Sequence, residues 1–218
     1  MLTPVLSVTT PATDLTLLTI DELRAIVGAN DKSRDADLKR LGDRAADAIV
    51  QACKLPADGA TPPTLRQEVL VDTFRLNRWW GKREHIGYLE DLVLSRRPIV
   101  SVASITETGV TLDPTSDYEI HAAAGTLTRL FNDQTSRWAA STIIVTYTAG
   151  WAVVPQGLKR AAEKLIRLYS ANESRDPLLR SEEVTGISSR TFWIGAPGDP
   201  SIPQDVMDDL GPYINPVV

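Results

Sequence analysis

The histidines and the cysteine are the residues of this chain that could most readily bind a metal ion or act in catalysis. Its 218 residues include only two histidines, His85 and His121, and one cysteine, Cys53. We find no ligand set for zinc or iron around either histidine. Cys53 lies on the apolar stripe of an expected helix, where cysteine behaves as a small hydrophobic residue rather than a nucleophile. We therefore assign no metal site, no cofactor and no catalytic residue.

Two acidic pairs and a glycine-rich turn could also carry chemistry. Glu182-Glu183 and Asp208-Asp209 are adjacent in sequence, so the carboxylates of each pair diverge on any regular element. General acid–base catalysis requires convergent groups, and we interpret both pairs as solvated surface. The turn at 195–198, Gly-Ala-Pro-Gly, lacks the Lys-Ser/Thr of a phosphate-binding loop. These patterns predict a protein that is not an enzyme.

Two aromatic clusters are better candidates for function. Trp79 and Trp80 precede several basic residues and could stack on single-stranded bases, or could fill the core and a subunit contact. The net charge of −5 and the pI of about 5.1 favour the contact. Phe192, Trp193 and Ile194 lie in a turn-rich stretch that cannot form its own core, which suggests docking onto a partner. We take all five as candidate assembly-interface residues.

Composition places the chain among soluble proteins of one large or two small domains. It is 43% hydrophobic and 23% charged. No apolar run approaches the roughly 20 residues that cross a bilayer, and the first residues do not resemble a signal peptide. A single cysteine suits synthesis in a reducing compartment. We therefore expect a cytoplasmic product with no membrane partner.

Helix signals occupy both ends of the chain. Thr19 and Glu22 form a capping-box pattern that begins a helix ending near Gly28. A longer helix follows from about Ser33 to Cys53, and another begins just after Pro155. We predict a helical bundle from residues 19–55 and 155–175, an N-terminal arm over 1–18, and a C-terminal arm over 176–218 that ends in a short helix.

Strand signals fill residues 65–151, which we predict to form an inserted antiparallel β domain. Residues 65–76 read as the first strand, with Val69, Val71 and Thr73 on one face and a helix as the alternative. The 142–148 stretch alternates in the same way, and Gly109 and Gly125 supply turns at hairpin spacing. The predicted fold class is α+β.

This order of elements resembles the head–tail connector (adaptor) proteins of tailed bacteriophages, of the gene-transfer-agent adaptor type. The resemblance is carried by RRPIVSVASIT, DYEI, IIVTYTAGW and VPQGLKRAAEKLIRLYS. It implies a virion protein of the neck, made in the host bacterial cytoplasm. It also implies a ring of twelve copies that docks on the portal protein and binds a tail-side neck, stopper or tail terminator protein. Double-stranded DNA would pass through the bore without specific binding.

Two alternatives stay open at this point. A tail-completion or neck protein of the same virion would share the structural character but contact the tail. A small phage enzyme is the second alternative, and it would require a metal or an activated nucleophile.

Overall fold

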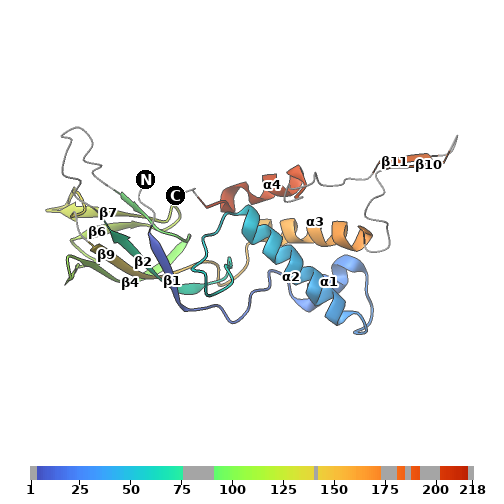
Figure 1. Cartoon of the computed structure of the whole chain (residues 1–218), viewed down its shortest axis with the longest axis horizontal. Coiled ribbons are helices and arrows are strands. Elements are labelled where there is room, and N and C mark those ends of the chain that lie inside the picture. The colour runs from blue at the N-terminus through green and yellow to red at the C-terminus, as the bar shows by residue number, and fades with distance from the viewer. Residues whose placement is uncertain are drawn as a thin grey trace. The chain divides into compact units, whose positions relative to one another are not determined.

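The computed structural model describes residues 4–75, 91–139, 142–172, 181–184, 188–191 and 202–215 (Figure 1). The chain divides into two compact units. The β unit comprises Met1–Asp14, Lys54–Val153 and Asn215–Val218, and the helical unit comprises Leu15–Cys53 and Val154–Ile214. Each unit therefore combines segments that are far apart in the sequence.

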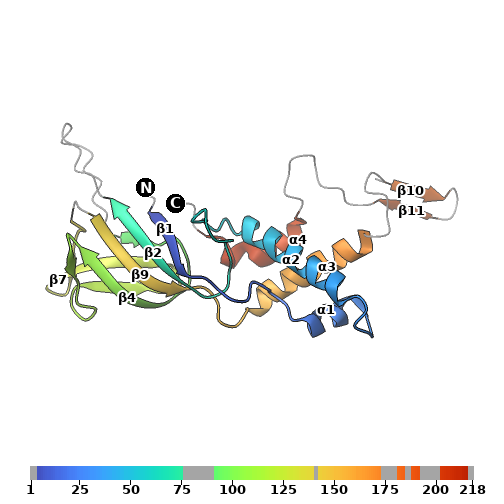
Figure 2. The same ribbon diagram turned by 60° about the horizontal axis from the view of Figure 1, so that its bottom comes forward.

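The helical unit contains α1 (Ile20–Val27), α2 (Asp35–Ala52), α3 (Gln156–Asn172) and α4 (Gln204–Leu210), which continues into a 3-10 turn at Gly211–Tyr213 (Figure 2). The capping box at Thr19 and Glu22 is present, and Gly28 ends α1 with a φ of 73°. α1 and α3 both pack on α2, and α4 packs on α3. Helices from both ends of the chain therefore form one bundle, as predicted.

The bundle is held together by the apolar stripes that the sequence displays. In α2 the buried residues recur every three or four positions: Leu38, Leu41, Ala45, Ala46, Ile49 and Val50. α3 contributes a matching stripe that is almost completely buried: Leu158, Ala161, Ala162, Leu165 and Ile166. The alanines on both helices allow the two backbones to approach closely.

The β unit contains two antiparallel sheets. The first has the order β1 (Val5–Thr10), β2 (Glu68–Arg75), β9 (Thr142–Ala149), β4 (Ile99–Glu107) and β5 (Val110–Thr111). The second has the order β3 (Asp91–Val93), β7 (Thr126–Phe131) and β6 (Tyr118–His121), and β8 (Gln134–Thr135) also pairs with β7. The antiparallel sheet and the strand at 65–76 are confirmed, so the helix alternative for that stretch is wrong.

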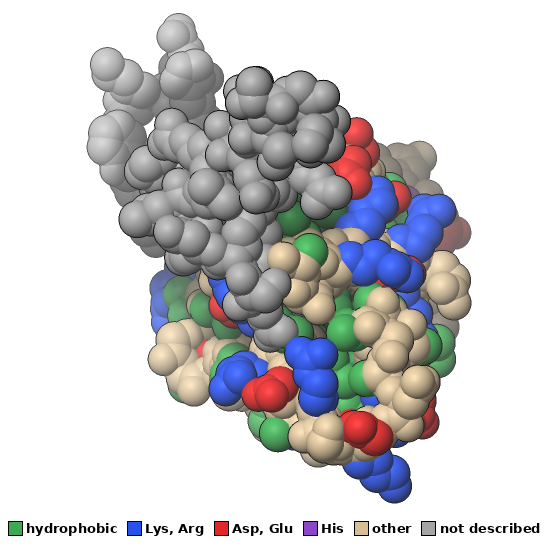
Figure 3. Space-filling model, turned by 90° about the vertical axis from the view of Figure 1, so that its right-hand side faces the viewer, with side chains coloured by type: hydrophobic (Ala, Val, Ile, Leu, Met, Phe, Trp, Pro, Cys, Tyr) green, Lys and Arg blue, Asp and Glu red, His purple; other side chains and the backbone are tan. Residues whose placement is uncertain are grey.

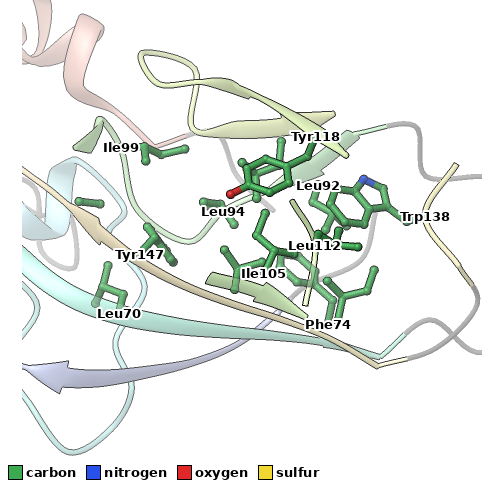
Figure 4. Packing of buried hydrophobic residues seen from close by; sticks show 14 residues of the cluster. Leu70, Phe74, Leu92, Leu94, Ile99, Ile105, Leu112, Tyr118, Trp138 and Tyr147 are labelled. Carbon is green, nitrogen blue, oxygen red and sulfur yellow. The ribbon is translucent and has the colours of Figure 1, made fainter. Parts of the chain in front are cut away.

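The core of the β unit is one hydrophobic cluster drawn from both sheets (Figure 4). Leu70, Phe74 and Tyr147 come from the first sheet, whereas Leu92 and Tyr118 come from the second. All five are nearly or completely buried. The two sheets therefore stabilise each other by burying apolar surface between them.

The terminal segments are tied in more closely than their sequence pattern suggests. β1 lies within the stretch predicted as an extended arm, and it pairs with β2 over Val5–Thr10. α4 lies within the predicted C-terminal arm, yet it packs on α3. In the sequence between α3 and α4, β10 (Ser181–Val184) and β11 (Ser188–Thr191) form a two-stranded hairpin. The partners of β1 and α4 are distant in sequence, so no local pattern reveals these contacts.

Candidate functional site

A buried polar cluster lies on the inward face of β2. Asp72 is fully buried and accepts hydrogen bonds from Ser95 N and Ser95 Oγ, each at 2.7 Å, and from Tyr147 OH at 2.9 Å. Burial raises the pKa of Asp72, and the three hydrogen bonds oppose that rise. Burial, together with the neighbouring Asp72, raises the pKa of Tyr147 well above its ordinary value. The cluster thus keeps Tyr147 neutral as a donor.

A buried ion pair between Arg96 and Glu68 lies next to this cluster. Arg96 Nη1 lies 3.7 Å from Glu68 Oε2, and both side chains are buried. Arg96 also donates to the carbonyl oxygens of Thr64 and, at 2.9 Å, of Pro56. Glu68 accepts from the Ala12 N–H at 3.3 Å. Burial dominates both groups, so it raises the pKa of Glu68 and lowers the pKa of Arg96 despite their mutual attraction.

These buried groups connect segments that are distant in the sequence. Asn215 Nδ2 donates to Ser95 O at 2.8 Å, so the residues before the C-terminus join the same network as the Pro56–Thr64 linker. The cavity lined by Glu68 and Arg96 measures about 10 Å³, room for at most one water molecule. No substrate fits there.

A larger apolar pocket lies within the helical unit. It measures about 320 Å³ and is lined mainly by aliphatic side chains from the segment before α1 and from α1, α2 and α3, including Leu17, Leu18, Leu23, Ala162 and Ile166. On the face of the molecule that carries α1 and α3, Figure 3 shows hydrophobic side chains between basic and acidic ones. Arg24 Nε donates to Asp35 Oδ1 at 2.8 Å and fixes α1 against α2 beside the pocket. The pocket offers burial of an apolar group, and Asp35, Lys39 and Asp43 also contribute to its lining.

One edge of the first sheet is covered by the chain itself. On β1, the Val8 N–H donates to Asp58 Oδ2 at 3.2 Å. The other oxygen of Asp58 accepts from the N–H groups of Ala60 and Thr61 at 2.9 and 2.8 Å, and these bonds hold its pKa well below the usual range. The linker between α2 and β2 therefore caps the edge strand, which discourages pairing with another chain.

Among the strands that the structure describes, none pairs with the opposite edge of that sheet along the first half of β4. β5 pairs with β4 only at Thr106 and Glu107, and on its other side β4 pairs with β9. Within the described residues, no strand covers the outer edge of 100–104, where Val100 is 54% exposed and Ala103 is also exposed. The stretch Val100–Ser104 contains neither charge nor proline. Such an edge is available for pairing with a strand of another molecule.

The predicted site residues have mixed outcomes. Trp79, Trp80, Phe192, Trp193 and Ile194 all lie outside the described residues, so their role stays a prediction. His85 also falls outside this part of the chain, whereas His121 is exposed on β6. Cys53 is completely buried at the end of α2, consistent with a small hydrophobic role.

The second acidic pair differs from its prediction in one member. Asp208 is exposed, but Asp209 lies only 2.8 Å from Lys164 Nζ and 3.5 Å from Arg160 Nη2, and its side chain is 18% exposed. These ion pairs attach α4 to α3, and Lys164 also bonds Asp205. The partners are more than forty residues apart, so no local sequence pattern indicates this role.

Within the described ranges we find no group of three or more His, Cys, Asp or Glu side chains placed to hold a metal ion. In the same part of the chain, no helix combines the length and apolar character that crossing a membrane requires.

Comparison with known proteins places the chain in a family. The model of the head completion protein family matches residues 16–178. The fold is similar to chains in the neck of an empty gene transfer agent particle computed with C6 symmetry (TM-score 0.54, 17% identity) and in the virion of a native gene transfer agent particle (0.54, 16%). A chain in the neck of the native particle computed with C12 symmetry gives 0.52 and 16%. Each alignment covers 98% of this chain and 96% of the other.

No curated protein matches the chain significantly. The family match nevertheless covers most of the sequence and includes α1, α2, α3 and strands β2–β9. It confirms the resemblance to phage head–tail connector proteins that the order of elements indicates. The chain belongs to the head completion protein family.

Proposed function

We propose that this protein is a head–tail connector (adaptor) subunit that forms a ring, docks on the portal protein and joins the capsid to the tail. The family match over residues 16–178 carries the proposal. The C6 and C12 symmetry of the particles that contain structurally similar chains supports a ring of twelve copies. Identical heterologous contacts repeated around an axis close into such a ring.

The proposed mechanism is passive. Packaged double-stranded DNA must slide through the bore, and strong phosphate contacts from lysine and arginine would hold it back. A net charge of −5 suits a channel without such contacts. The Asp72 side chain is completely buried, and the cavity beside Glu68 has no room for a substrate. Both observations support a structural role rather than an enzymatic one.

Assembly would be carried by apolar anchors. Phe192, Trp193 and Ile194 are proposed to grip the portal protein or a neighbouring subunit, and Trp79 and Trp80 to lie at a subunit contact. Aromatic residues dominate the binding energy of many interfaces because each buries a large apolar area at a low entropic cost. The apolar pocket of the helical unit provides a surface of matching chemistry.

A double substitution tests the anchors. Phe192→Ala/Trp193→Ala should weaken binding to purified portal protein, or ring formation, at least tenfold, as measured by co-sedimentation and native mass spectrometry. Phe131→Ala is the matched control, because Phe131 is a 68% exposed aromatic residue on β7. If the double variant binds and assembles like the unaltered protein, the anchor assignment is wrong.

Deletion of the gene tests the function itself. We expect DNA-filled heads without tails, and electron microscopy should locate the protein in the neck of complete virions. Complete, infectious particles without the protein would overturn the proposal. Binding to a tail protein but not to the portal would instead identify a tail-completion protein.

A further inference from the structure

The hairpin formed by β10 and β11 has no sheet to join within its own described chain. Among the described residues the two strands pair only with each other, from Ser181↔Thr191 to Val184↔Ser188. The eight strand residues include a single apolar one, Val184. An isolated two-stranded hairpin is at best marginally stable in water, and this one lacks an apolar face to add stability. It therefore needs a third strand from outside.

The open half of β4 offers the complementary edge. Its residues Val100–Ser104 are small or β-branched and uncharged. On their other side Ser101, Val102 and Ser104 pair with β9, and the register shifts between Ile99 and Ser101 and again between Val102 and Ser104. The competing edge of the same sheet, β1, is capped by Asp58. An incoming strand on β4 would satisfy backbone groups that now face outward, as in β-strand addition.

We propose that, in the ring, β11 of one copy adds to the β4 edge of the next copy and extends its five-stranded sheet. β11 is favoured over β10 because it reads Ser-Ser-Arg-Thr, whereas β10 carries two adjacent glutamates. Small hydroxyl residues pair well beside Ser101, Ala103 and Ser104 across a strand pair.

The symmetry of a closed ring favours a neighbouring copy as the partner. Eight residues separate the end of α3 from β10, and they can span at most about 28 Å, close to the diameter of a small domain. Each copy carries one hairpin and one open edge, so donor and acceptor can alternate around a closed ring. The inference rests on the proposed connector function, because only a ring supplies the neighbour at a fixed position.

Disulfide trapping in assembled particles tests the contact. Ser189→Cys combined with Ser101→Cys or with Ala103→Cys should give, under mild oxidation, a ladder of covalent multimers on a non-reducing gel. A ladder arises because each copy links to two neighbours. Cys53 can stay in place because it is completely buried. Each single-cysteine variant should give no ladder.

The matched control moves the acceptor cysteine to the other edge of the sheet. Val5→Cys on β1, 58% exposed, combined with Ser189→Cys should not cross-link. Particles that contain the ring but give no ladder from either β4 position overturn the proposal. An intramolecular link, or a cross-link to the portal protein, overturns it equally. Images of the same particles show whether the ring is present, so failure of the connector function itself is read separately.

Discussion

Replacement of Asp72 by alanine should remove a large part of the protein's stability. The change removes the acceptor for three buried donors: Ser95 N, Ser95 Oγ and Tyr147 OH. A buried donor without a partner costs about 1–3 kcal/mol, so we expect a loss on the order of 3–5 kcal/mol. A protein of this kind has only about 5–15 kcal/mol in total.

Two further variants show how much of this loss of stability comes from a single hydrogen bond and how much from burial of the site. Tyr147→Phe removes one donor and leaves Asp72 with both Ser95 bonds, so it should cost about 1–2 kcal/mol. Asp113→Ala is the control, because Asp113 is an exposed aspartate that also accepts from the N–H and Oγ of Thr115. That exposed site should cost far less than Asp72 does, since water replaces the lost partner.

Urea unfolding followed by circular dichroism measures these differences, with the slope of the transition checked for two-state behaviour. The pH dependence gives a second readout. Burial raises the folded-state pKa of Asp72 above its ordinary value of 3.8, so the folded state binds the extra proton. The contribution of protonated Asp72 to the free energy of unfolding is therefore present at low pH and is lost as the pH rises through the folded-state pKa.

Asp72→Asn should therefore flatten the decline of stability on the alkaline side of pH 3.8. Glu68 has a raised pKa for the same reason and would leave a residual decline. An Asp72→Ala variant that unfolds within about 1 kcal/mol of the unaltered protein would refute the reasoning, because it would mean that the three donors are satisfied without the carboxylate.

Two other predictions concern single contacts. In Asp58→Ala the Val8 amide loses its acceptor and should exchange with deuterium faster, as peptide-level exchange would show; unchanged protection would mean that the linker does not cap β1. Gly150→Ala should destabilise the protein by about 2–4 kcal/mol, because the added Cβ would lie 2.4 Å from Arg66 O at a φ of 101°. Gly59→Ala should cost only about 1 kcal/mol, because Gly59 has a φ of 82° but open space around the added Cβ. Equal melting temperatures for the two glycine variants would contradict this account.

Several elements could be predicted from sequence because their causes are local. The capping box at Thr19 and the stop at Gly28 depend on residues within one or two helical turns. The stripes of α2 and α3 and the alternation of β9 are periodic patterns within a short window. The same order of elements also indicated the family.

Tertiary structure decided the rest. Val69 and Val71 were grouped correctly on one face of β2, but the buried face is the opposite one, which carries Glu68 and Asp72. A local sequence pattern predicts that a carboxylate faces solvent, because the groups that compensate for its burial lie elsewhere in the chain. For Asp72 the partners are 23 and 75 residues away.

The same distinction applies to assembly. Residue types alone marked aromatic anchors, because large apolar groups in a turn-rich segment lack a core of their own. Only the tertiary structure revealed which sheet edge is capped, at Val8, and which edge has no partner among the described strands, at Val100–Ser104. An edge is defined by the absence of a neighbouring strand, and such a relation between distant segments has no signature in local sequence.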